Sequence, residues 1–289
     1  MIIDCHYHLE ESILTVDELI RRMDEAGVDR IALMGSQIGA MREPSTALVG
    51  LNLFLLTHRF TRPISRPFIA NFTEKGIKIL GKEMEISRDP DNGAVFDAVR
   101  ARPDRFLGWI FVNPAGERDQ EEEFRRYCSE NGFVGVKAHP FWNHHTPLDL
   151  LPVARLCAES GRPLLIHAGF GAEGDFGALL AKVPELTLIL AHAGFPGYSD
   201  TWKEIFNRKN VYVDLSQTSY VGEKIMKAVI DRLGPERCLF GTDGPYGFHG
   251  KDGTFDYGLI KRRIERLVPD AGARRMILGD NFAAIAGIE

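Results

Sequence analysis

Apolar runs recur along the chain at a regular spacing from residue 106 onward. Each run is almost continuous in apolar residues, which is typical of parallel strands covered by helices. Successive runs start 24 to 29 residues apart, a distance that fits one strand, one helix and two short loops. The runs begin near Phe106, Phe133, Arg162, Leu186, Val211 and Cys238.

Between these runs, segments that end at a glycine predict helices, because glycine readily adopts the left-handed conformation that follows a helix. In the last of them the apolar residues follow the 3.6-residue period of a helix. The chain therefore alternates strand and helix. The predicted helices are 121–131, 150–160 and 223–233, followed by Gly132, Gly161 and Gly234.

The N-terminal third adds two more strands, at 1–9 and 30–36, separated by a helix that Thr15 and Glu18 open with capping-box spacing. Eight βα units predict an α/β protein with a closed (β/α)8 TIM barrel rather than an open sheet. We expect one domain over residues 1–289. Residues 37–90 are too long for a loop after the second strand, so we interpret them as an insertion over the barrel mouth.

The composition argues against nucleic acid and membrane as binding partners. The 289 residues are 44% hydrophobic and 26% charged, with a net charge of −5, so the chain is an ordinary globular protein without the basic face that nucleic acid requires. The longest apolar run, 48–56, is far below the ~20 residues of a membrane span. We expect a small-molecule substrate, no nucleic acid and no membrane.

The four cysteines are scattered without CxxC spacing, which favours neither a disulfide framework nor a thiolate zinc site. A reduced, cytoplasmic setting fits this usage best. A homodimer is the default expectation for a soluble enzyme.

Histidines and carboxylates gather at predicted strand ends. Because side chains alternate along a strand, Asp4, His6 and His8 are expected to share one face. A single histidine at a strand end is usually just a hydrogen-bonded polar group. The complete set at one rim of a parallel barrel instead predicts an active site that binds zinc, iron(II) or manganese. The other members of the set are His167, His192 and Asp243.

This ordered set resembles the amidohydrolase superfamily, and more narrowly its amidohydrolase-related (amidohydrolase 2) group of TIM-barrel metal-dependent hydrolases. The resemblance covers nearly the whole chain apart from the insertion. It rests on the HxH of residues 6–8 and on the motifs LLIHAGF, LILAHAGF and LFGTDGP, with further matches at VKAHP, VYVDLS and ILGDN.

The resemblance implies that His6, His8, His167 and Asp243 bind a divalent metal, with zinc as the first expectation and manganese or iron as alternatives. His192 would be a second-metal ligand or a catalytic residue. Lys137 stands where two-metal members carry a carboxylated, bridging lysine. An unmodified lysine paired with Asp243 or with a substrate carboxylate is the alternative, so one or two ions remain open.

A divalent cation lowers the pKa of bound water to ~7, and Asp243 is placed to act as general base and then acid. This predicts a hydrolase of a small carbonyl compound: an amide, lactone or ester, bearing a carboxylate. The first alternative is a decarboxylase or other lyase on the same scaffold, since relatives of this group include decarboxylases. The second alternative is a non-catalytic metal-binding barrel.

Four further residues are candidates for contacting the substrate. Arg59 and Arg62, in the insertion, could clamp a carboxylate, although exposed arginines in loops more often only interact with water. His139 could point into the barrel, and Trp142 could form a wall of the pocket or simply pack at the rim.

Overall fold

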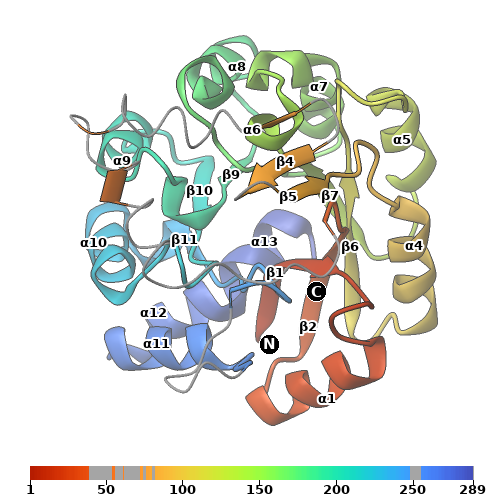
Figure 1. Ribbon diagram of the computed structural model, residues 1–289. Helices are drawn as coiled ribbons and strands as arrows, with labels where there is room; N and C mark the ends of the chain where they lie inside the picture. The colour runs from red at the N-terminus through yellow and green to blue at the C-terminus, as the bar shows by residue number, and fades with distance from the viewer. Residues whose placement is uncertain are drawn as a thin grey trace.

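The structure is a computed structural model that describes residues 1–38, 54–55, 61, 72–73, 76–79, 82–247 and 255–288, with the backbone alone at 72–73, 76–79 and 82–85. Eight parallel strands follow one another around a barrel, and helices form its outer ring (Figure 1). The predicted (β/α)8 fold is confirmed. In barrel order the strands are β1 (Ile3–Leu9), β2 (Arg30–Gly35), β6 (Phe106–Phe111), β7 (Phe133–Ala138), β8 (Leu164–Ile166), β9 (Leu188–Leu190), β10 (Val211–Asp214) and β11 (Cys238–Leu239).

The barrel closes between β1 and the segment that follows β11. The Cys5 amide donates to the Phe240 carbonyl at 3.0 Å, and the Asp243 amide donates to the His6 carbonyl at 2.7 Å. A parallel bridge between Tyr7 and Gly244 extends this pairing. The closure brings the first and last candidate site segments together.

The helices begin and end largely where the sequence predicts. Thr15 accepts a hydrogen bond from the Glu18 amide at the start of α1, and Gly161 and Gly234 have φ of 65° and 89°. One helix is shorter than expected, since α5 stops at Tyr127 and the polar residues before Gly132 form turns. The helices are α1 (Val16–Ala26), α4 (Asn92–Ala101), α5 (Gln120–Tyr127), α6 (Pro140–Asn143), α7 (Leu151–Glu159), α8 (Phe176–Lys182), α9 (Ser199–Ile205), α10 (Glu223–Leu233), α11 (Leu259–Leu267), α12 (Ala271–Arg275) and α13 (Asn281–Ala286).

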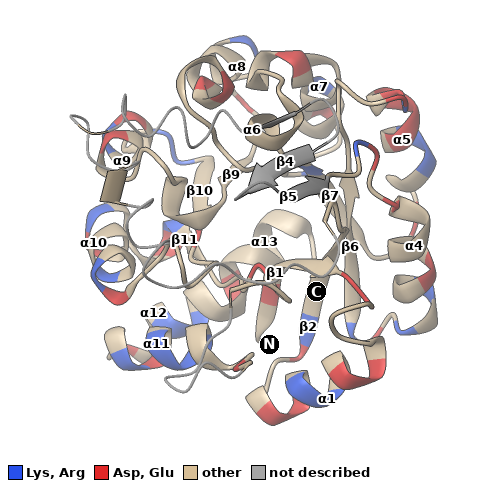
Figure 2. Ribbon diagram, viewed as in Figure 1, with Lys and Arg blue, Asp and Glu red and all other residues tan. Residues whose placement is uncertain are grey.

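Two buried apolar clusters hold the layers together. The larger lies between the strands and the surrounding helices, and the smaller fills the barrel, with Trp109 packed on Phe282 and donating to the Cys5 carbonyl at 2.9 Å. Charged residues of both signs lie along the outer helices (Figure 2). Within the described residues, none of these helices has the length and apolar character needed to cross a membrane.

A β-bulge in β1 corrects one expectation. Asp4 pairs with Ile31 and Tyr7 with Leu33, so an extra residue is accommodated between Asp4 and Tyr7. The bulge interrupts simple alternation. His6 and His8 line the cavity described below, whereas Asp4 accepts hydrogen bonds from Thr242 and Tyr257.

A similar irregularity in β7 changes its inner face. The register shifts between Gly108, opposite Phe133, and Trp109, opposite Gly135. Phe133 therefore packs outward against Tyr127, while Lys137 still lines the cavity. Simple alternation along the strand would place Phe133 and Lys137 on one face, and the register shift explains why they lie on opposite faces.

Only parts of the predicted insertion are described. They include a three-stranded antiparallel sheet of β3 (Phe72–Thr73), β4 (Gly76–Ile79) and β5 (Lys82–Glu85). Near this sheet, hydrogen bonds at the barrel rim join residues that are far apart in the sequence. The Gln37 side chain donates to the Ser87 carbonyl at 3.1 Å and to Asn143 Oδ1 at 2.7 Å.

Candidate metal centre

A cavity of about 350 Å³ lies at the carboxyl ends of the barrel strands, the end at which TIM-barrel enzymes place their chemistry. The topology explains the convergence, because parallel strands from distant parts of the chain end at the same rim. The polar lining includes His6, His8, Lys137, His139, His167, His192, Gln217 and Asp243, and the rest is largely Ile13, Ile38, Trp142, Tyr220, Pro245 and Tyr246.

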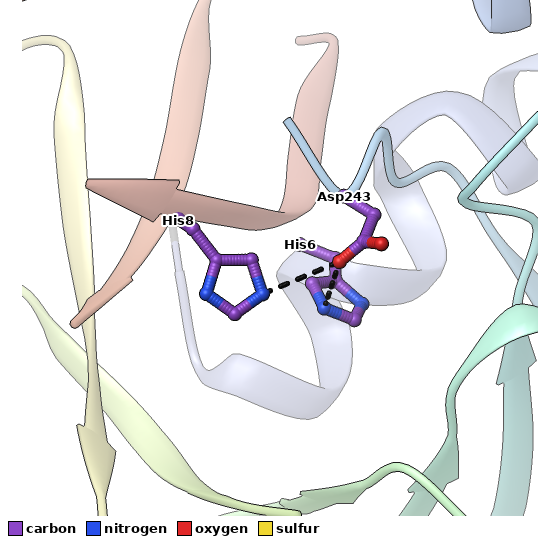
Figure 3. A group of neighbouring side chains, drawn as sticks. All are labelled: His6, His8 and Asp243. Carbon is purple, nitrogen blue, oxygen red and sulfur yellow. Dashed lines mark ion pairs between the residues drawn. The ribbon is translucent and has the colours of Figure 1, made fainter. Parts of the chain in front are cut away.

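Two of these histidines converge on one carboxylate oxygen of Asp243. Asp243 Oδ1 lies 3.0 Å from His6 Nε2 and 3.3 Å from His8 Nε2 (Figure 3). These three groups can offer ligand atoms that all lie within 4.8 Å of one another. The other carboxylate oxygen, Asp243 Oδ2, accepts a hydrogen bond from Gln217 Nε2 at 2.9 Å.

Asp214, at the end of β10 and fully buried, supports two histidines at once. Its Oδ2 lies 2.9 Å from His6 Nδ1, and its Oδ1 accepts the His192 amide at 2.9 Å. Ser216 Oγ donates to Asp214 Oδ1 and lies 2.8 Å from His192 Nδ1. Because a carboxylate can only accept, the proton of Ser216 points to Asp214, and Ser216 accepts from His192 Nδ1.

The hydrogen-bond partners of the Nδ1 atoms assign the protons on four rings. His6 donates to Asp214, His192 to Ser216, His8 to the Gly35 carbonyl at 3.4 Å and His167 to the Ala168 carbonyl at 3.0 Å. In the neutral ring each Nε2 is then an unprotonated acceptor. This is the arrangement in which protein histidines bind metals.

His139 has the opposite polarity. Its Nδ1 accepts the backbone amide of Trp142 at 3.1 Å, as the cap of α6. In the neutral ring the proton must therefore lie on Nε2, which makes this atom a donor. The ring stacks on His167 at 4.2 Å between centroids.

Burial lowers the pKa of four of these rings and so favours their neutral state: His8, His139, His167 and His192. At His6, Asp214 and Asp243 outweigh burial and raise the pKa. Burial alone would raise the pKa of Asp243, but His192 and His6 hold it well below its ordinary value. Burial lowers the pKa of His192 to about 4 and that of Lys137 to about 8. At neutral pH Asp243 is thus a carboxylate, His192 a neutral imidazole and Lys137 mainly an ammonium.

Three cavity residues adopt a backbone conformation that side chains rarely take. His192, Gln217 and Asp243 have φ of 55°, 65° and 62°. Non-glycine residues in this left-handed region carry strain of about 1 kcal/mol or more, and such positions cluster at functional sites.

The chemistry of this donor set fits a divalent cation. His6 Nε2 is buried and has no hydrogen-bond partner, although it faces Asp243 Oδ1 at 3.0 Å. When His6 is neutral, with its proton on Nδ1, two acceptors held at this distance repel one another unless a proton or a metal ion lies between them. Imidazole with carboxylate is a ligand set suited to zinc, iron(II) or manganese.

The remaining predicted site residues lie at different distances from this group. His167 contacts His192 and His139 in the same cavity, but in the described part of the chain it joins neither cluster of potential ligands. The second such cluster is His6, His192 and Asp214, whose atoms are already hydrogen-bonded. Lys137, His139 and Trp142 line the cavity, and Arg59 and Arg62 lie outside the described residues.

Sequence reasoning gave too little weight to three residues. Asp214 and Ser216 follow a buried strand in VYVDLS, and neither they nor Gln217 are among the predicted site residues. The signal was available, since Asp214 ends the seventh strand of a barrel whose other strand ends carry the histidines.

Comparisons with known proteins find similar sequences and similar folds. A family model described as amidohydrolase matches residues 81–285. Protein fluG of Emericella nidulans is 24% identical over 157 residues, which are 47% of this chain and only 18% of that protein.

Solved structures share the fold across the full chain. 5-Carboxyvanillate decarboxylase LigW from Sphingomonas paucimobilis is 17% identical with a TM-score of 0.62, covering 100% of this chain and 99% of that one. A candidate 2-pyrone-4,6-dicarboxylic acid hydrolase from Pseudomonas putida is 18% identical with a TM-score of 0.64, covering 100% and 98%. 4-Oxalomesaconate hydratase LigJ from Rhodopseudomonas palustris is 16% identical with a TM-score of 0.63, covering 99% and 96%.

Proposed function

Since the chain belongs to the amidohydrolase family, whose members are metal-dependent enzymes, we propose that it hydrolyses a small amide, lactone or ester that bears a carboxylate. The observation that carries the proposal is the convergence of His6 Nε2 and His8 Nε2 on Asp243 Oδ1. We propose that these groups hold zinc, with manganese or iron(II) as alternatives, and that His167 completes the ligand set.

A divalent cation held there would lower the pKa of a water molecule to about 7 and polarise the scissile carbonyl. Asp243 receives the proton of the attacking water at Oδ2, the oxygen that Gln217 orients, and later delivers it to the leaving group. This role needs a carboxylate at neutral pH, a form that the hydrogen bond donated by Gln217 favours and that a bound cation would favour further.

In this scheme His192 is a neutral hydrogen-bond acceptor for the attacking water. Ser216 fixes its Nδ1, so its Nε2 lone pair faces Asp243 Oδ2 at 3.9 Å. From there His192 can accept a hydrogen bond from the attacking water and align it for the carbonyl.

A decarboxylase is the second candidate. Its support is the full-length similarity of fold to two decarboxylases, for 5-carboxyvanillate and for 2,6-dihydroxybenzoate, and the same ligands can serve both reactions. Measuring carbon dioxide release beside ester, lactone and amide hydrolysis separates the two candidates.

The test combines metal content with turnover on a panel of carboxylate-bearing esters, lactones and amides. His6→Ala should lose both bound metal and turnover, while the matched control His144→Ala, at an exposed histidine outside the cavity lining, should keep both. Equal turnover by metal-free and metal-loaded protein would overturn the proposal.

A further inference from the structure

Lys137 is a cation in an unusual position. Its side chain is only 1% exposed, lies at the end of β7 and lines the cavity. Among the described lining residues it is the only lysine or arginine. Within the described part of the chain, no carboxylate oxygen forms an ion pair with it within 4.0 Å.

The carboxylates that influence Lys137 from a distance have other partners. Asp243 and Asp214 both favour its charged form. However, Asp243 is shared by His6, His8 and Gln217, and Asp214 by His6 and Ser216. A buried ammonium without a close counter-ion is costly, so this environment favours the arrival of an anion from the cavity.

His139 adds a hydrogen-bond donor beside Lys137. The two residues are neighbours at the end of the same strand, and each is more than nine-tenths buried while lining the cavity. Because the Trp142 amide occupies His139 Nδ1, the neutral ring presents Nε2–H. A donor beside an ammonium is suited to a carboxylate and unsuited to a metal ion.

We propose that Lys137 Nζ and His139 Nε2 form a binding site for one carboxylate of the substrate, beside the His6–His8–Asp243 group. This inference rests on the proposed function, because it takes the cavity as the substrate site. It replaces the alternative in which Lys137 is carboxylated and bridges two metals.

The walls of the cavity define the rest of the ligand. The rings of Trp142 and His139 contact one another at a tilt, with 4.9 Å between their centroids, and Tyr220 and Tyr246 supply further aromatic surface. With a single cationic side chain in the described lining, the site fits a small monocarboxylate with a flat, aromatic or unsaturated body.

The test uses benzoate and its neutral analogue benzamide as probes, with binding measured by calorimetry on metal-loaded and chelator-treated protein. We expect the wild type to prefer benzoate by about 10- to 100-fold, the range for a charged hydrogen bond. The preference should persist without metal. Lys137→Met should abolish it, while Lys182→Met, the same substitution at an exposed lysine of α8, should leave it unchanged.

Three outcomes would overturn the inference: no benzoate preference in the wild type, an unchanged preference in Lys137→Met, or loss of bound metal in that variant. A carbamate resonance from ¹³C-bicarbonate in the wild type would also overturn it. Should Lys137→Met fail to fold, Lys137→Arg is expected to keep the preference and His139→Asn to weaken it. Because binding is measured without turnover, failure of the proposed hydrolase activity would not affect this result.

Discussion

Two sides of one cavity use histidine in opposite ways. On the metal side, defined by His6, His8 and Asp243, the rings present unprotonated Nε2 atoms. On the anion side, defined by Lys137 and His139, the groups facing the cavity are donors. Both sides are buried and line the same cavity at the carboxyl ends of the barrel strands, so burial alone does not distinguish them.

The difference arises at the far nitrogen of each ring. An acceptor at Nδ1, such as Asp214 or a backbone carbonyl, leaves Nε2 free to bind a cation. A donor at Nδ1, the Trp142 amide, gives His139 a proton at Nε2. The partner behind a histidine is therefore a better guide to its role than its place at the rim.

The largest effect should follow from Asp243→Asn, which removes the carboxylate from the metal side. We expect kcat to fall by about 10³-fold or more, because both a ligand and the proton acceptor are lost. Benzoate preference on the anion side should survive. Steady-state kinetics and metal analysis check this, and retained turnover in Asp243→Asn would contradict the assigned role.

A second, smaller effect should distinguish the roles of Asp214 and Ser216, which contact the Nδ1 atoms of His6 and His192. Asp214→Asn should weaken metal affinity by about 10- to 100-fold, because it perturbs the orientation of His6. Ser216→Ala removes the acceptor of His192 Nδ1 and one donor to Asp214 but keeps the contact of Asp214 with His6, so metal affinity should match the wild type while kcat falls by about tenfold. Competition with a chelator and initial rates provide the measurements. Equal loss of metal in both variants would show that the network acts as one structural unit.

The barrel could be predicted because its signals are local and repeated. Each apolar run predicts one strand, and the glycines and the Thr15 cap mark the ends of helices. The alternating order of these strands and helices is enough to predict the barrel. The bulges in β1 and β7 could not be predicted, since they depend on pairing with β2 and β6. The sheet of β3, β4 and β5 was likewise missed, because strands of two to four residues carry little periodic signal.

The sequence predicts which residues form the candidate site, but not which histidine nitrogens are donors and which are acceptors. His6, His8 and Asp243 could be grouped from strand ends alone, and the structure brings them together. The sequence does not show that Trp142 caps His139 or that Asp214 contacts His6, because both depend on the fold around each ring. Those contacts distinguish a ligand from a donor.

A third prediction uses two variants of His139 to test whether its Nε2 donor binds the substrate carboxylate. His139→Asn keeps an acceptor for the Trp142 amide, a good helix cap, but lacks a donor at the Nε2 position. His139→Gln places an amide donor near that position. We expect KM for a carboxylate substrate to rise about five- to tenfold in His139→Asn and to recover partly in His139→Gln, with kcat nearly unchanged. A matching fall in kcat in both would place His139 in the chemistry instead.

The smallest effect should come from Tyr246→Phe, which tests whether the metal side depends on this aromatic ring or on its hydroxyl. The Tyr246 ring packs edge-on against His8 with 5.6 Å between centroids, and its hydroxyl bonds Ser36 Oγ at 2.8 Å and the Ile38 carbonyl at 2.5 Å. Phenylalanine keeps the ring and loses the hydrogen bonds, so the midpoint temperature of thermal unfolding should fall by about 2 to 3 °C. Metal affinity should stay within about threefold of the wild type, since His8 keeps its packing and its contact with Gly35. Should chelator competition instead show a tenfold loss of metal with unchanged thermal stability, the hydroxyl rather than the ring would be holding His8 in place.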